Sequence, residues 1–194
     1  MNNKKKGLQR VLLKSVYVIL PFIESRLANN KLRKRIEKNN ENKISDVDFD
    51  DVHLEALKED YNSSIDRSKR LEDKAKSLLI AWTISITLIF NLPKFMRLTH
   101  ASFMIIKVNI ILSIATVLYM ILAGIMVTQV LTAENVINVI GLQKRDDKEE
   151  YYRATLGNNY RNLIRNNNIV TAYRAVINSF ICLGIIFLMN IFSS

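Results

Sequence analysis

The stretch FMIIKVNIILSIATVLYMILAGIMVTQV, residues 103 to 130, decides the architecture of this chain. It runs for 28 residues and carries a single charged side chain, Lys107. A bilayer core of about 30 Å is crossed by roughly 20 apolar helical residues, so this segment is long enough to span a membrane and to tilt within it.

Two further apolar runs, Ser77–Leu92 and Ala175–Phe192, lie on either side of it. The later run has an adequate length, whereas Ser77–Leu92 is the weakest and needs local thinning or snorkelling by flanking lysines. Pro93 is expected to stop the first helix, so that Pro93–Ser102 connects it tightly to the second span. We therefore expect an all-α integral membrane protein with three transmembrane helices and a helical cytosolic head and stalk.

This pattern divides the 194 residues into five parts. A basic amphipathic helix and charged linker occupy residues 1–50, and a cytosolic stalk helix occupies 51–76. A transmembrane hairpin follows at 77–130, then a cytosolic helical segment at 131–174 and a third transmembrane helix at 175–194.

The positions of lysine and arginine predict the orientation in the membrane. Many of these residues precede the first span or lie between the second and third, whereas only Lys94 and Arg97 lie between the first two. Because loops that hold such charges stay inside, the N-terminus is expected in the cytoplasm and the C-terminus outside. The absence of a cleavage site after the first residues also predicts that no signal peptide is removed.

Two basic features mark the N-terminal part of a chain whose net charge is +10. Apolar residues recur at helical spacing from Leu8 to Ile23, which predicts an amphipathic helix that lies on an anionic membrane surface or packs on the rest of the head. A basic cluster follows, which we expect to contact an anionic surface, a regulatory protein or a ribonucleoprotein; it comprises Lys31, Arg33, Lys34, Arg35 and Lys38.

Apolar residues at intervals of three and four predict two stalk helices. One stripe begins at Leu54 and runs without glycine or proline toward the first span; it comprises Leu54, Leu57, Tyr61, Ile65, Leu71, Ala75 and Leu78. A second stripe leads into the third span and comprises Leu156, Tyr160, Leu163 and Val170. Such stripes most simply pack on each other. We also expect Glu134–Leu142 to continue the second span as a helix.

The sequence predicts no catalytic residues, no metal ligands and no cofactor. Its one cysteine, Cys182, excludes a disulfide framework, and the five glycines form no phosphate-binding loop. His53 and His100 lie on opposite sides of the membrane in the expected topology. Asp46, Asp48 and Asp50 have the spacing of a calcium loop, but the glycine and glutamate that complete such a loop are missing. A non-enzymatic protein is therefore expected.

Uncharged polar residues recur within the three spans and are the remaining candidates for function. They are Thr83, Thr87 and Asn91 in the first span, Asn109, Ser113 and Thr116 in the second, and Asn178 in the third. Such residues serve helix packing through hydrogen bonds, or they line a water-filled path between helices of an oligomer. The sequence leaves both interpretations open.

Two segments carry a resemblance to known proteins. YNSSIDRSKRLEDKAKSL at Tyr61–Leu78 leads into the hairpin, and YYRATLGNNYRNLIRNNNIVTAYR at Tyr151–Arg174 leads into the last span. This arrangement resembles the small transmembrane effectors of bacterial antiphage defence, of the SLATT type or linked to retrons or cyclic nucleotides. The resemblance implies a protein of the bacterial inner membrane that oligomerises when activated and permeabilises the membrane in abortive infection. The alternative is a membrane anchor that recruits a soluble partner complex.

Overall fold

The computed structural model describes residues 16–17, 19–42, 49, 51–95, 103–132, 138–144 and 146–192; for residues 36–42, 88, 90–95 and 142 it describes the backbone alone. Within this part the chain is all-α. Its four helices are α2 (Pro21–Asn42), α3 (Leu54–Phe95), α4 (Phe103–Leu131) and α5 (Lys148–Ile191), with a 3₁₀ turn, η2 (Leu142–Lys144), before α5.

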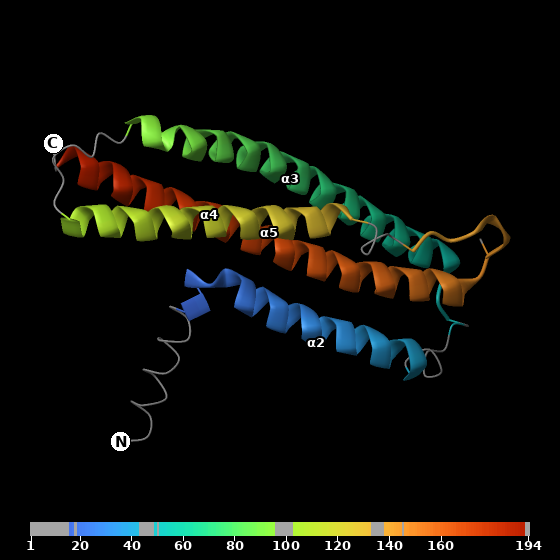
Figure 1. Ribbon diagram of the computed structural model, residues 1–194. Helices are drawn as coiled ribbons and strands as arrows, with labels where there is room; N and C mark the ends of the chain where they lie inside the picture. Colours follow the sequence, from blue (N-terminus) through green and yellow to red (C-terminus); the bar gives the residue numbers. More distant parts are fainter. Residues whose placement is uncertain are drawn as a thin grey trace, which may run out of the picture.

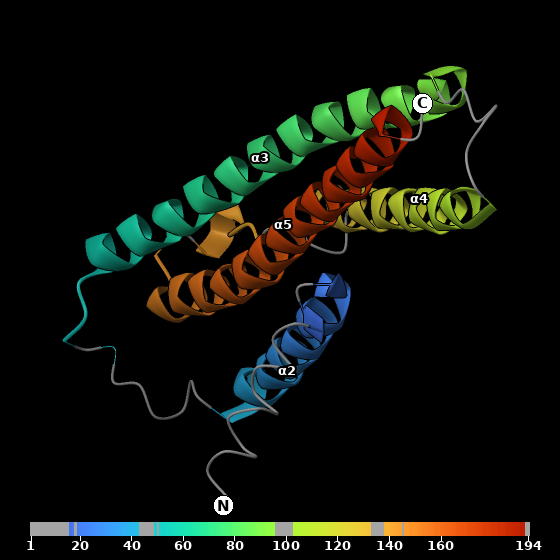
Figure 2. The same cartoon turned by 90° about the vertical axis from the view of Figure 1, so that its left-hand side faces the viewer.

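Three long helices lie side by side, with α3 and α5 running in the same direction and α4 running against them (Figures 1 and 2). The shorter α2 lies along α5, on the side away from α3 (Figure 2). Helix α5 packs against each of the other three helices, so it is the centre of the arrangement.

Local sequence explains where α5 begins. Asp147 caps the helix, because its carboxylate accepts a hydrogen bond of 3.2 Å from the backbone N–H of Glu150. Glu149 and Glu150 occupy the first turn, where the helix dipole favours negative charge. Helix α2 begins at Pro21, a residue that suits the first helical turn because its missing N–H has no partner there.

The stalk stripe predicted for α3 is confirmed. Its residues are buried against the neighbouring helices in two apolar clusters, one around Leu71, Ala75 and Leu78 and one around Leu57 and Tyr61. The aromatic rings of Tyr61 and Tyr151 meet edge to face at 5.5 Å in the second cluster. Helix α3 also begins at Leu54 as expected and continues without a break beyond residue 77.

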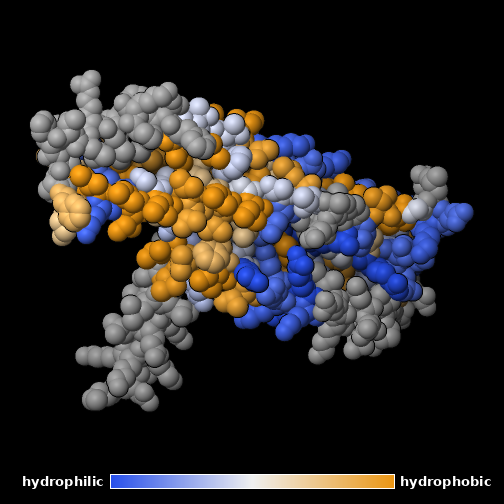
Figure 3. All heavy atoms as spheres, viewed as in Figure 1, coloured by the Kyte–Doolittle hydropathy of each residue, from blue (hydrophilic) through white to orange (hydrophobic). Residues whose placement is uncertain are grey.

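The molecule has an apolar half, which consists of residues 77–89 of α3, helix α4 and residues 175–191 of α5 (Figure 3). Many large side chains of this half are exposed, among them Ile80, Ile84, Ile111, Leu118, Phe187 and Leu188. Residues 54–76 of α3, residues 148–174 of α5 and the segment 138–144 make up the charged half. Such a division is costly in water, because each exposed apolar Å² costs about 25 cal/mol.

Two helices, α4 and α5, are long and apolar enough to cross a membrane among the described residues. The expectation of three spans is therefore met only in part, because α3 does not belong to this set. The described apolar side chains of α3 are few, because those of residues 88 and 90–95 lie outside the described part and more than half of this 42-residue helix precedes residue 77.

Two boundaries were predicted wrongly. Helix α3 continues past Pro93 and ends at Phe95, because a proline in the last turn removes only one hydrogen-bond donor. Helix α4 ends at Leu131 and residues 138–141 are not helical, so the predicted continuation over Glu134–Leu142 fails in its described part, whereas residues 134–137 lie outside the described residues. Most of the predicted helix from Leu8 to Ile23 lies outside the described residues, as do Asp46, Asp48, Asp50 and His100.

One glycine allows α3 and α4 to approach closely. A Cβ atom on Gly124 would lie 2.8 Å from Cζ2 of Trp82, well inside van der Waals contact. The indole is held in place because its Nε1–H donates a 2.6 Å hydrogen bond to the carbonyl oxygen of Met120. The Nε1 edge of the Trp82 ring therefore packs on α4 at a position where that helix has no side chain.

We predict that Gly124→Ala destabilises the protein by about 1–3 kcal/mol, because the rigid indole must move to make room. Gly184→Ala is the matched control, since a Cβ atom there meets nothing within 4 Å. Thermal unfolding in detergent measures the difference. Equal unfolding temperatures for the two variants would show that the close contact of Trp82 with Gly124 is not needed.

Candidate functional site

Helix α5 turns a polar face toward the other helices in the charged half. Asn158, Asn162, Arg165 and Asn168 are all buried along this face. Leu163 and Val170, which we expected to be buried in the stalk, are 47% and 41% exposed. The predicted second stripe is therefore wrong at these two positions, whereas Leu156 and Tyr160 are half-buried, because hydrogen bonds to the neighbouring helices help to decide which face of α5 is inside.

The first part of this face joins α3 to the segment before η2. The Nδ2 group of Asn162 donates to the carbonyl oxygen of Ser64 at 2.8 Å. Asn158 accepts at 2.7 Å from the backbone N–H of Asn138, and its own amide donates to the Asn138 carbonyl oxygen at 3.3 Å. Tyr61 of α3 donates to the same carbonyl at 3.2 Å. The connection between α4 and α5 is thus held by side chains of α3 and α5.

Arg165 is the charged member of this face and is only 6% exposed. Its Nε group donates to the carbonyl oxygen of Val130 at 3.2 Å, and Nη1 donates to the hydroxyl of Ser68. No carboxylate of the described residues forms an ion pair with it. The guanidinium therefore ties α5 to α3 and to the last turn of α4 through uncharged acceptors.

The acid that acts on Arg165 from a longer distance is Glu72 of α3. Lys76 lies 2.8 Å from its carboxylate and, through this hydrogen bond and its charge, lowers the pKa of Glu72 from the usual value. The charge of Arg165 lowers this pKa further, to a smaller extent. Both carboxylate and lysine are largely exposed, so we assign the pair little stabilising effect.

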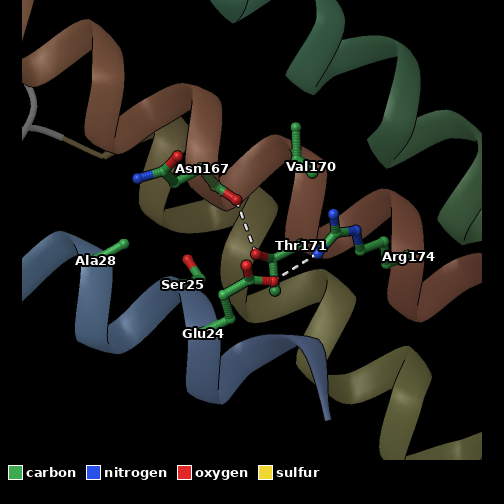
Figure 4. Close-up of a pocket in the computed structure, with 7 residues that line it drawn as sticks. All are labelled: Glu24, Ser25, Ala28, Asn167, Val170, Thr171 and Arg174. Carbon is green, nitrogen blue, oxygen red and sulfur yellow. Dashed lines mark hydrogen bonds and ion pairs between the residues drawn. The ribbon is translucent and has the colours of Figure 1, made fainter. Parts of the chain in front are cut away.

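Polar contacts also hold α2 against α5. Asn29 donates to the side-chain oxygen of Asn168 at 2.8 Å and accepts from Asn167 at 2.9 Å. Glu24 and Arg174 form an ion pair of 2.8 Å at the edge of a small pocket of about 150 Å³ (Figure 4). Helix α2 is therefore attached mainly through hydrogen bonds and one exposed ion pair rather than through a large apolar contact.

The apolar half also has polar side chains in its interior. Asn109 of α4 is 2% exposed, and its amide donates to the side-chain oxygen of Asn190 on α5 at 3.3 Å. Its own carbonyl oxygen has no hydrogen-bond partner. Thr116 of α4 and Ser179 of α5 are buried too, as is Ser85 of α3. These side chains line the inner faces of three helices whose outer faces are apolar.

The predicted polar residues of the spans are thus placed in different surroundings. Asn109 and Thr116 lie inside the bundle, and Ser113 and Asn178 are half-buried. Thr83 and Thr87 are exposed, and their hydroxyls donate to the carbonyl oxygens one turn earlier in α3. The side chain of Asn91 lies outside the described residues. The structure therefore brings the stripe of α4 to α5 but turns that of α3 outward.

The predicted basic cluster lies on α2. Lys31, Arg33, Lys34 and Arg35 are exposed there, whereas the side chain of Lys38 is outside the described part. The sequence analysis missed the polar face of α5. Its signal was present, because Asn158, Asn162 and Arg165 recur at intervals of four and three and match Ser64 and Ser68 of α3.

These arrangements position helices and present charge, and the described residues hold no group of three His, Cys, Asp or Glu side chains suited to a metal ion. No protein family, curated protein or solved structure matches the chain.

We predict that Arg165→Lys lowers the free energy of unfolding by about 1–3 kcal/mol, because a strongly hydrated ammonium replaces the guanidinium fork in a buried place. Arg153→Lys is the control, since Arg153 forms an exposed ion pair of 2.6 Å with Glu149 one turn away. Thermal unfolding compares the two variants. If Arg165→Lys leaves the unfolding temperature unchanged, the guanidinium of Arg165 has no structural role.

Proposed function

We propose that this chain is a multi-pass protein of a bacterial inner membrane that oligomerises and permeabilises the membrane when activated, as an effector of antiphage defence by abortive infection. In this proposal the N-terminus lies in the cytoplasm and the C-terminus lies outside. Helix α3 supplies a third membrane-spanning segment beside α4 and α5.

The observation that carries the proposal is the polar interior of the apolar half. Asn109, Thr116 and Ser179 are buried between helices whose outer faces carry large apolar side chains. Within a bilayer, a buried carbonyl oxygen without a partner, such as that of Asn109, favours any rearrangement that supplies a donor or water. Helices that separate in an oligomer would expose these groups to one another and to a water-filled path.

The proposal of a third span is supported by the position of residues 77–89 of α3. Residues 77–89 run beside the apolar parts of α4 and α5 (Figures 1 and 2). Ile80 and Ile84 are 64% and 57% exposed on the outer face of this stretch. The position of residues 77–89 beside α4 and α5, together with the exposed isoleucines, supports insertion of this part of α3 into the membrane. The charged residues before 77 would stay at the membrane surface.

A reporter fused after Ser194 distinguishes three spans from two. With the N-terminus inside, three spans place Ser194 outside, whereas α4 and α5 alone return it to the cytoplasm. We predict that alkaline phosphatase fused there is active and that a fluorescent protein that folds only in the cytoplasm is dark. The same pair of reporters before Pro21 should give the reverse. An inactive phosphatase after Ser194 would exclude the third span.

Membrane permeabilisation is tested by the uptake of an impermeant dye and by membrane potential in cells that express the chain. We predict that Asn109→Leu reduces dye uptake several-fold at equal membrane abundance, because an apolar side chain removes the unpartnered carbonyl and favours the closed bundle. Thr87→Val is the matched control, since that hydroxyl lies on the exposed face of α3. Full membrane potential under activating conditions would rule the function out.

The alternative function is that of an anchor for a soluble partner complex. The exposed basic residues of α2 favour it, because they offer a charged surface away from the apolar half. Replacing Lys31, Arg33, Lys34 and Arg35 with glutamine should then release a stoichiometric partner from the purified protein. An anchor would also leave membrane potential intact when expressed alone.

A further inference from the structure

A basic groove lies between α3 and α5 in the charged half. Its volume is about 300 Å³, and the cations that line it are Arg67, Arg70 and Lys74 of α3. The opposite wall is formed by Asn162, Leu163 and Asn166 of α5. The groove therefore combines three positive charges with side-chain amides, and no acidic residue lines it.

The three cations are not neutralised within the described part of the chain. None of them forms an ion pair there, and all three are exposed. Two neighbouring acids are paired with other lysines, Asp66 with Lys69 at 3.8 Å and Glu72 with Lys76 at 2.8 Å, and Asp73 forms no ion pair among the described residues. Positions 67, 70 and 74 share one face of the helix, so their positive charges converge on the groove.

The groove lies next to the beginning of the apolar half. Helices rise about 1.5 Å per residue, so Lys74 precedes residue 77 by about 4.5 Å and Arg67 precedes it by about 15 Å. The polar headgroup layer of a bilayer adds roughly 5–8 Å on each side of the hydrocarbon core, and long basic side chains reach into it. Lys74 is thus placed at the level of the lipid phosphates, Arg70 lies just outside it at about 10.5 Å, and Arg67 faces the outer end of the headgroup.

The opposite wall suits a lipid better than a small soluble anion. Leu163 is 47% exposed at the groove, although it belongs to a segment rich in asparagine. Asn166 is exposed beside it, whereas the amide of Asn162 already donates to Ser64. An apolar side chain beside a free amide and three cations matches the phosphate and the outer headgroup glycerol of a lipid such as phosphatidylglycerol.

We propose that the groove between α3 and α5 binds the phosphate headgroup of an anionic phospholipid. Lys74 and Arg70 contact the phosphate, Arg67 and Asn166 donate to the oxygens of the outer headgroup, and Leu163 packs on a headgroup glycerol such as that of phosphatidylglycerol. This inference rests on the membrane placement in the proposed function, but not on permeabilisation. The bound lipid would clamp the two parallel helices α3 and α5 at the membrane surface.

The test uses the full-length protein in nanodiscs of phosphatidylcholine alone or of phosphatidylcholine with phosphatidylglycerol. The anionic lipid should raise the unfolding temperature by about 2–4 °C. Replacing Arg67, Arg70 and Lys74 together with glutamine should remove this increase. The charge-matched control replaces Lys31, Arg33 and Arg35 of α2 with glutamine and should keep it.

Two further measurements distinguish a specific lipid site in the groove from general attraction by surface charge and from a site for a soluble anion. Asn166→Leu leaves every charge in place and should still reduce the increase. Inorganic phosphate added to nanodiscs of phosphatidylcholine should give no increase, since it lacks the lipid's glycerol and its location. An equal increase with phosphate would overturn the assignment to a lipid, and an equal loss in the α2 control would overturn the assignment to the groove.

Dye uptake by the same variants keeps this inference separate from the proposed function. If the groove variant responds to phosphatidylglycerol like the wild type while permeabilisation is observed, the lipid site is wrong and the proposed function stands. If the lipid response depends on the groove but membrane potential stays intact on activation, the site stands and the permeabilising function falls.

Discussion

The structure depends on the hydrogen bonds that α5 makes through its polar face. This helix contacts α2, α3 and α4, and at Asn158, Asn162, Arg165 and Asn168 it does so with buried polar groups. A buried amide or guanidinium is tolerable only when its partners are in place, and a missing partner costs about 1–3 kcal/mol. The relative positions of all four helices are therefore constrained by one face of one helix.

This constraint divides the structure into two kinds of contact. In the apolar half, helices meet through close packing, as where Gly124 makes room for Trp82. In the charged half, they meet through apolar clusters and also through directional bonds that specify register, as between Asn162 and Ser64. Apolar packing tolerates a small sliding of helices, whereas hydrogen bonds between buried groups do not. The charged half thus holds in register the long helices whose other ends form the apolar half.

The same division into an apolar and a charged half underlies the proposed function and the proposed lipid site. Helix α2 is attached by Asn29, an exposed ion pair and few apolar contacts, so a binding partner can compete with those contacts in water. Asn109 keeps an unpartnered oxygen inside the apolar half, where water is absent when the helices are closed. The groove of Arg67, Arg70 and Lys74 lies in the charged half, close to the level where the proposed membrane begins.

The sequence by itself determined the all-α class, the run at residues 103–130 and the buried stripe of α3, because hydrophobic periodicity reports burial when one face of a helix is apolar. Only the tertiary structure decided which face of α5 is inside. There the apolar residues Leu163 and Val170 are exposed, whereas Asn158, Asn162 and Asn168 are buried. Periodicity counts apolar side chains alone, whereas the energy of a polar side chain depends on whether a distant residue such as Ser64 or Ser68 supplies its hydrogen-bond partner. That partner exists only once the helices are packed.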